Sequence, residues 1–194
     1  MFNSNNKMKM SDELIEIYEP YRLVKLGPRS INPNDIIGFS LTRQEILDSS
    51  KLQILQESMM RKVGSRYIYE LILLPNGKFT VGNGGNHRAY LSKKLKLSSV
   101  SAHIDILIAE RDISKSTIFQ IEQLEQVTLE INKQIKILTK YLNLEGVKRN
   151  LLQDESLTSL HSKADFNDWT INQLLIIEVK NLGYLPNSLF ERNF

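Results

Sequence analysis

The sequence predicts an α+β fold, because a β-hairpin and a later strand precede a long amphipathic helix. Residues 67–74 are dense in aromatic and β-branched side chains, and a turn at Pro75-Asn76-Gly77 leads to a second short strand at 78–81. A further strand is expected over 100–109. Residues 116–144 take long-helix spacing, so a C-terminal helical extension should follow the sheet.

Upstream of the hairpin, the sequence predicts a short strand and a helix. Residues 23–26 are apolar enough for a strand, which Gly27-Pro28 is expected to end. A helix is expected over 43–62, and Ser49 or Ser50 is placed to break or recap it.

Composition excludes several classes of protein. The chain has 194 residues, 41% of them hydrophobic, which is enough to bury a core and argues against global disorder. It has no cysteine, which removes disulfides, thiolate zinc sites and cysteine catalysis. No apolar run is long enough to span a bilayer and the start does not resemble a signal peptide, so we expect a cytoplasmic protein without a membrane partner. No pair of histidines or carboxylates has metal-ligand spacing, so no protein metal site is expected.

The formal charge of +3 hides a basic central stretch. Between residues 61 and 96 a single acid, Glu70, stands among eight basic residues: Arg61, Lys62, Arg66, Lys78, Arg88, Lys93, Lys94 and Lys96. Such a stretch attracts polyanions, although an ordinary solvated face explains it equally well.

A glycine loop lies inside this stretch, at residues 82–86 between the hairpin and the next helix. Glycines at a strand-to-helix junction allow close backbone approach, and the start of a helix attracts anions. His87 and Arg88 follow in the first helical turn, where both can reach the same phosphate oxygens. The alternative is a plain connection with an incidental histidine. The spacing fits neither a Walker A loop nor a dinucleotide fingerprint.

The run Gly84-Gly85-Asn86-His87-Arg88, in this setting, resembles the box of the ParB/sulfiredoxin superfamily. The opening turn at Ile31-Asn32-Pro33 and the helix ending at Gly64 also match, so the resemblance covers about residues 22–108. It implies a small mixed sheet with helices, forming a nucleotide-binding domain over 13–113. A flexible leader at 1–12 would precede this domain, and the helical extension at 114–194 would follow it.

The resemblance also implies a set of nucleotide-binding residues. The ATP-contacting lysine and hydroxyl residue of sulfiredoxins fall on Lys51 and Ser58, which are two helical turns apart and share one face. The other members of the set are Gly84, Gly85, Asn86, His87 and Arg88. Asn86 takes the place of the sulfiredoxin catalytic cysteine, which excludes sulfiredoxin activity.

Three functions are consistent with these features. The first is an ATP- or ADP-dependent phosphotransferase or nucleotide hydrolase that uses ATP or another nucleotide, with Mg²⁺ arriving with that nucleotide. Its catalytic residues would be His87 and Arg88, with Glu57 or Glu45 as general base. The second is a ParB-like DNA-associated partition or regulatory protein with a nucleotide switch and loose DNA-backbone binding, although nothing after Ser114 resembles a recognition helix. The third is a non-enzymatic interaction protein of phage or plasmid type.

The helix expected at 116–144 has one heptad face, with Thr128 as its polar exception. This face could pack on the same chain, which we favour, or join a homodimer or a protein partner. A polar loop is expected after Gly146, and another helix over 169–180. The apolar heptad positions are Ile121, Leu124, Ile131, Ile135, Leu138 and Leu142.

Overall fold

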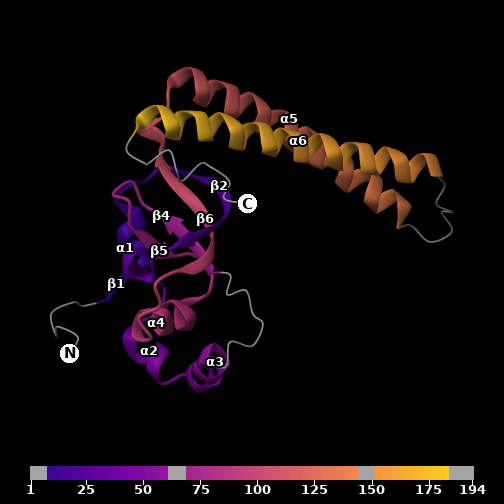
Figure 1. Cartoon of the computed structure of the whole chain (residues 1–194). Helices are drawn as coiled ribbons and strands as arrows, with labels where there is room; N and C mark the ends of the chain where they lie inside the picture. The colour runs from indigo at the N-terminus through magenta and orange to yellow at the C-terminus, as the bar shows by residue number, and fades with distance from the viewer. Residues whose placement is uncertain (1–7, 61–68, 144–150, 184–194) are drawn as a thin grey trace. The chain divides into compact units, whose positions relative to one another are not determined.

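The computed structural model describes residues 8–60, 69–143 and 151–183 (Figure 1). Two compact units make up the chain. We call Met1–Asp112 with Leu182–Phe194 the sheet unit, and Ile113–Asn181 the helical unit. The predicted α+β class is confirmed, because the described part of the sheet unit holds a six-stranded mixed sheet and the helical unit holds two long helices.

The sheet has the strand order β1-β3-β5-β4-β6-β2. β3 runs parallel to both β1 and β5, and β4 runs parallel to β6. The β4–β5 and β6–β2 pairs are antiparallel, and the first of these is the predicted hairpin. The strands are β1 (Lys9–Met10), β2 (Tyr21–Ile31), β3 (Ile36–Phe39), β4 (Tyr69–Leu73), β5 (Phe79–Val81) and β6 (Val100–Ala109).

The core follows the alternation of the central strands. In β6 the side chains of Ala102, Ile104 and Ile106 are fully buried, while those of Ser101 and His103, which alternate with them, are exposed. Period-two burial of this kind is typical of a strand with one covered face. The strand predicted over 100–109 is therefore confirmed.

The prediction that Gly27-Pro28 ends the first strand is wrong. β2 continues through both residues, and its register against β6 shifts between Lys25 and Gly27. Gly27 has a φ of 82°, which suits a β-bulge, and β2 is an edge strand, where proline is tolerated.

The prediction of a flexible leader over 1–12 is also wrong for residues 9–12, which belong to a strand and a helix. Residues 1–7 lie outside the described part of the chain. β1 pairs with β3, and α1 (Ser11–Glu16) begins directly after it. The buried Ser11 Oγ donates to the Val81 carbonyl at 2.9 Å and accepts from Thr80 Oγ1 at 2.7 Å. These buried hydrogen bonds hold a segment whose polar composition gave no sign of order.

Three helices of the sheet unit lie together at one end of the sheet: α2 (Arg43–Leu47), α3 (Lys51–Met60) and α4 (Asn86–Lys94) (Figure 1). The predicted break is confirmed, because α2 and α3 are separate and Ser49 Oγ accepts from the Lys51 backbone N–H at 3.3 Å. Between β2 and β3 the short 3-10 helix η1 (Pro33–Asp35) forms the proline turn.

The helical unit consists of α5 (Lys115–Leu142) and α6 (Leu151–Leu182), which lie side by side and antiparallel (Figure 1). Asn167 Nδ2 donates to Thr128 Oγ1 at 3.1 Å, and Thr117 and Ser114 both donate to Glu178 Oε1. The heptad face of α5 therefore packs on α6 of the same chain. The predicted polar loop is wrong from residue 151 onward, because α6 begins there. None of the described helices is long and apolar enough to cross a membrane.

Gly38 provides a test of the sheet packing. An added Cβ would lie 2.1 Å from Thr80 Oγ1 and 2.7 Å from Leu14 Cδ1. We expect Gly38→Ala to lower the free energy of unfolding by about 2–3 kcal/mol in urea denaturation, because neither neighbour can move freely. Thr80→Ala removes the atom nearest to the added Cβ, so the double variant should lose less stability than the two single variants lose together. Strict additivity would contradict this account.

Candidate functional site

The candidate site lies where two parallel strands end. After β3 the chain passes through Ser40 to α2, and after β5 it passes through residues 82–85 to α4. In sheets with parallel neighbours, ligands bind near the carboxyl ends of the strands, where the following helices begin. The glycine loop singled out from the sequence occupies this edge.

The loop leaves the start of α4 accessible to a ligand. Gly84 and Gly85 have φ values of 85° and 87°, which side chains rarely adopt. Gly85 is the N-cap residue of α4 and provides no side-chain cap. A Cβ added to Gly84 would meet nothing within 4 Å, so the space beside it is open. The first N–H groups of a helix lack intrahelical acceptors, and together with the helix dipole they favour an anion here.

Asn86 has a structural task within the loop. Its buried side chain accepts from the Ser40 backbone N–H at 2.9 Å and donates from Nδ2 to Ser40 Oγ at 3.1 Å. These contacts tie the start of α4 to the residue that follows β3. Asn86 therefore offers a ligand its backbone rather than its side chain.

His87 carries the most informative side chain of the site. Its Nε2 atom is buried and has no hydrogen-bond partner among the described residues. Burial lowers the pKa of His87, and the positive charge of Lys51 lowers it further. The structure therefore brings Lys51 of α3 close enough to His87 of α4 for their charges to interact.

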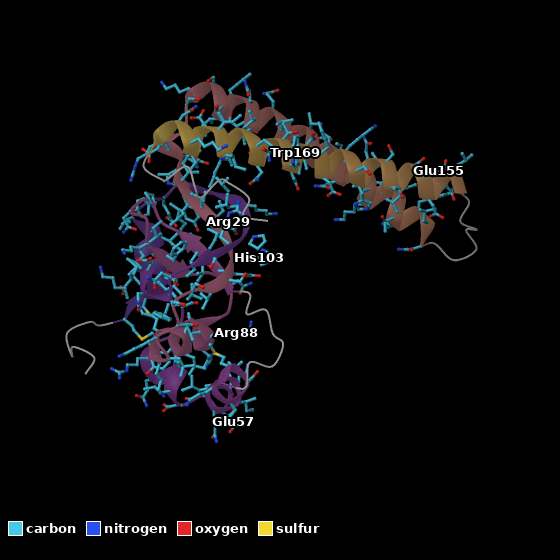
Figure 2. All side chains as sticks on the ribbon, viewed as in Figure 1. Arg29, Glu57, Arg88, His103, Glu155 and Trp169 are labelled. Atoms are coloured by element: carbon cyan, nitrogen blue, oxygen red, sulfur yellow. The ribbon has the colours of Figure 1, made fainter. Side chains whose placement is uncertain are left out.

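Arg88 is half-buried in the first turn of α4 (Figure 2). Ser58, also half-buried, lies two turns after Lys51 on the same face of α3. Glu57 is exposed and emerges about 100° round the helix from Ser58. Lys51 and Ser58, the predicted nucleotide-binding residues of α3, therefore share one face of the helix, and Glu57 points away from that face.

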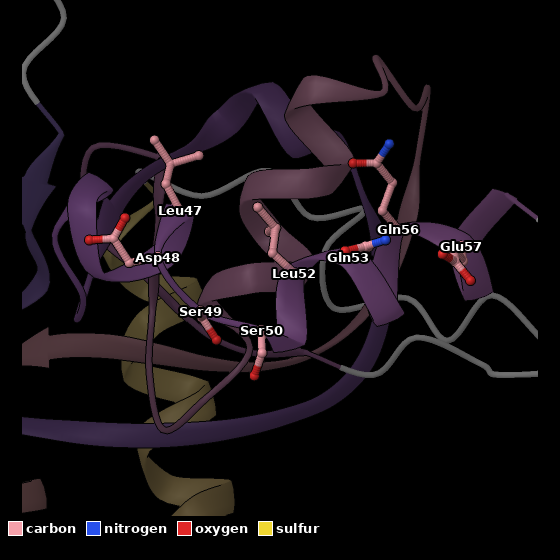
Figure 3. Close-up of a pocket in the computed structure, with 8 residues that line it drawn as sticks. All are labelled: Leu47, Asp48, Ser49, Ser50, Leu52, Gln53, Gln56 and Glu57. Atoms are coloured by element: carbon pink, nitrogen blue, oxygen red, sulfur yellow. The ribbon is translucent and has the colours of Figure 1, made fainter.

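Glu57 instead lines a groove of about 500 Å³ along α3 (Figure 3). The other lining residues are Leu47, Asp48, Ser49, Ser50, Leu52, Gln53 and Gln56. Glu45, the other base suggested by the sequence, accepts from the Thr42 backbone N–H and hydroxyl at 2.7 Å each. These hydrogen bonds lower the pKa of Glu45, so it is a weaker base.

A cavity of about 380 Å³ adjoins the glycine loop at Gly82 and Asn83. Glu70 and Asp105 also line it, and neither was singled out from the sequence as a site residue. Burial raises the pKa of Asp105; the charge of nearby Lys25 opposes this rise, whereas Glu70 adds to it. No sequence signal could have paired these carboxyl groups, because β4 and β6 meet only in the folded sheet. The described residues contain no cluster of three or more histidine and acidic side chains that could hold a metal ion.

Parts of the basic stretch have contacts within the sheet unit. Lys78 Nζ lies 2.7 Å from Asp35 Oδ1, and Lys93 Nζ donates to the Ile36 carbonyl at 2.6 Å. Burial lowers the pKa of Lys93, whose ammonium group also lies 5.9 Å from the Phe39 ring centroid. Arg61, Lys62 and Arg66 lie outside the described residues. Because Lys93 is near the far end of α4, its charge is directed away from the glycine loop.

No family model, curated protein or solved structure matches this chain. The resemblance to the ParB/sulfiredoxin superfamily therefore stays a prediction.

The pKa of His87 tests the site geometry. By NMR titration it should lie below the usual value of about 6.5, and Lys51→Ala should raise it. The matched control Lys94→Ala removes an exposed lysine from the last turn of α4 and should leave it unchanged. A lowered pKa means that the folded state binds fewer protons than the unfolded chain, so stability falls as the pH drops below about 6.5. An equal response to both variants would refute the Lys51–His87 proximity.

Asn86→Ala tests the structural role of that side chain. It leaves the Ser40 backbone N–H without its acceptor, which should lower the free energy of unfolding by about 1–3 kcal/mol in chemical denaturation. Ser40→Ala removes only the hydroxyl and keeps the backbone hydrogen bond, so it should lower the free energy of unfolding by less than Asn86→Ala does. If Ser40→Ala is the more destabilising change, the backbone hydrogen bond is not the main contribution.

Proposed function

We propose that the sheet unit binds a nucleotide through its phosphate groups at the start of α4. One observation carries the proposal: among the described residues the buried Nε2 of His87 has no hydrogen-bond partner, and His87 lies within range of the Lys51 charge in the first turn of a helix that begins without a side-chain cap. A buried polar atom without a partner is costly, and a bound anion would both accept its hydrogen bond and balance the Lys51 charge.

Each residue has a separate task in this proposal. The backbone N–H groups at the start of α4 donate to phosphate oxygens, which Gly84 and Gly85 allow to approach closely. Arg88 supplies a guanidinium fork, and Lys51 supplies a point charge. Ser58, on the Lys51 face, adds a hydroxyl group, and Asn86 holds the loop in place.

ATP or another nucleotide is the proposed ligand. Mg²⁺ bound with such a ligand is held largely by phosphates and water, so it needs few protein carboxylates. This requirement is compatible with the described residues, which offer no dedicated metal cluster.

The proposed activity is phosphoryl transfer to an acceptor or to water. Catalysis of this reaction depends mainly on positioning and on charge neutralisation, which His87, Arg88 and Lys51 provide at the glycine loop. Glu57 is left out of the proposed machinery because it is turned away from the Lys51 face of α3. Release of phosphate or transfer of a labelled γ-phosphate, measured over a nucleotide panel, tests the activity. DNA binding that requires nucleotide would favour the ParB-like alternative instead.

Arg88→Ala should weaken nucleotide binding. Loss of a charge-assisted hydrogen bond is worth about 1.5–3 kcal/mol, so Kd should rise about 10- to 100-fold in calorimetry with ATP, ADP or CTP. The control Lys94→Ala removes one positive charge from the other end of α4 and should change Kd little. Circular dichroism establishes that both variants are folded. If the wild type binds no nucleotide, or if both variants bind equally well, the site assignment is refuted.

A further inference from the structure

The helical unit exposes an unusual number of large apolar side chains. On α5, Ile137 is 70% exposed and Phe119 is 61% exposed. On α6, Phe166 and Trp169 stack with ring centroids 5.8 Å apart, yet both remain more than half exposed. The other members are Val127 and Tyr141 on α5, and Leu152 and Ile177 on α6. We call these eight residues the apolar row.

The apolar row lies on one broad side of the hairpin. The contact of Thr128 with Asn167 fixes which face of each helix points inward. Each residue turns a helix by about 100°, so the apolar row lies roughly 120° around α5 from the face that contacts α6. On α6 it lies roughly 140° around the helix from the face that contacts α5. Because the helices are antiparallel, these rotations bring both halves of the row to the same side. The opposite side carries charged residues, namely Glu125, Lys136, Asp154 and Asp165, together with the exposed Leu129.

We propose that this side binds a second copy of the chain, with two hairpins forming an antiparallel four-helix bundle around a two-fold axis. In that bundle α5 packs on α5 of the second copy, and α6 packs on its α6. A two-fold contact must be self-complementary, so each group needs its counterpart on the same surface. This requirement can be checked on each helix separately.

The aromatic residues of α5 meet this requirement. Phe119 lies near the start of α5 and Tyr141 near its end, and both belong to the apolar row. With the axis between residues 130 and 131, Phe119 of one copy lies nearly level with Tyr141 of the second copy. This aromatic pair therefore forms twice, once on each side of the axis.

The residues of α6 provide an independent check. Because Thr117 faces Glu178 and Thr128 faces Asn167, an axis at 130–131 of α5 crosses α6 between residues 164 and 165. Leu152 and Ile177 lie equally far from that point along the helix, so each meets the other residue on the second copy. One axis therefore satisfies both helices.

The size of the surface also fits a dimer. α5 has 28 residues, which gives a length of about 42 Å. Two helices packed about 10 Å apart present a side of roughly 40 by 20 Å, or about 800 Å² per copy. A standard stable interface buries about this area on each partner.

Cysteine cross-linking tests the pairing and its direction. The chain has no cysteine of its own, so a single introduced thiol can link only to its copy. Glu130→Cys lies next to the axis and should form a disulfide-linked dimer under mild oxidation. Gln123→Cys, on the same side of α5, lies about 22 Å from its copy along the helix and should remain unlinked. Linkage of both variants would indicate parallel helices, and linkage of neither would indicate no contact; either result overturns the proposal.

Sedimentation equilibrium of the full chain tests the energetics. Ile137→Glu places a charge in both copies of the contact and should raise the dimer Kd at least about 100-fold. The control Leu129→Glu introduces the same charge at an exposed apolar residue on the opposite side of α5 and should leave Kd unaltered.

A wild-type chain that remains monomeric at its highest soluble concentration would overturn the proposal. If that monomer instead bound neutral phosphatidylcholine vesicles, and Ile137→Glu abolished this binding, the occupant of the apolar row would be a lipid surface. Neither result depends on whether the sheet unit binds a nucleotide.

Discussion

The hydrogen bonds between Asn86 and Ser40 fix the geometry on which the candidate site depends. They fasten the first residue of α4 to the chain just beyond β3. At the other end of the helix, Lys93 donates to the Ile36 carbonyl at the start of β3. Helix α4 is therefore held at both ends by one strand, and the glycine loop between β5 and α4 has little freedom to shift. A rigid loop of this kind gives His87 and Arg88 defined positions, which a binding site requires.

The same interactions explain why the start of α4 is open. Gly85 occupies the N-cap position and has no side chain to offer, while the side chain of Asn86 is bound to Ser40. The helix therefore begins without a side-chain cap, and the buried Nε2 of His87 has no partner among the described residues, although the charge of Lys51 is nearby. A fold optimised for stability alone would satisfy these groups, since each buried polar atom without a partner costs about 1–3 kcal/mol. A buried polar atom without a partner is more typical of a functional site, and this one supports the proposed binding of phosphate groups at the start of α4.

Local chemistry determined which elements the sequence could predict. The hairpin, the start of α4 after the glycines and the break at Ser49 all depend on turn or capping residues close in sequence. By contrast, β1 and β3 are short and owe their order to neighbours in the sheet, and the first half of α6 is mostly polar. The candidate site divides in the same way. The loop residues were predicted from the local pattern, and Lys51 was grouped with them only through the family resemblance. The proximity of Lys51 to His87 and the role of Asn86 arise from tertiary contacts, which no local pattern encodes.

In the helical unit the hydrogen bond between Thr128 and Asn167 determines how α5 and α6 align along their length. Most inward positions of α5 and α6 are aliphatic, and such faces tolerate a slip of one heptad with little loss of contact. A slip would separate Thr128 from Asn167 and leave polar groups facing aliphatic side chains, so this pair selects one register. In that register Leu152 and Ile177 of α6 are centred on nearly the same level as Phe119 and Tyr141 of α5. In any other register the two helices would require different two-fold axes. The complementarity of the apolar row therefore depends on a hydrogen bond that lies inside the hairpin and not in the proposed interface.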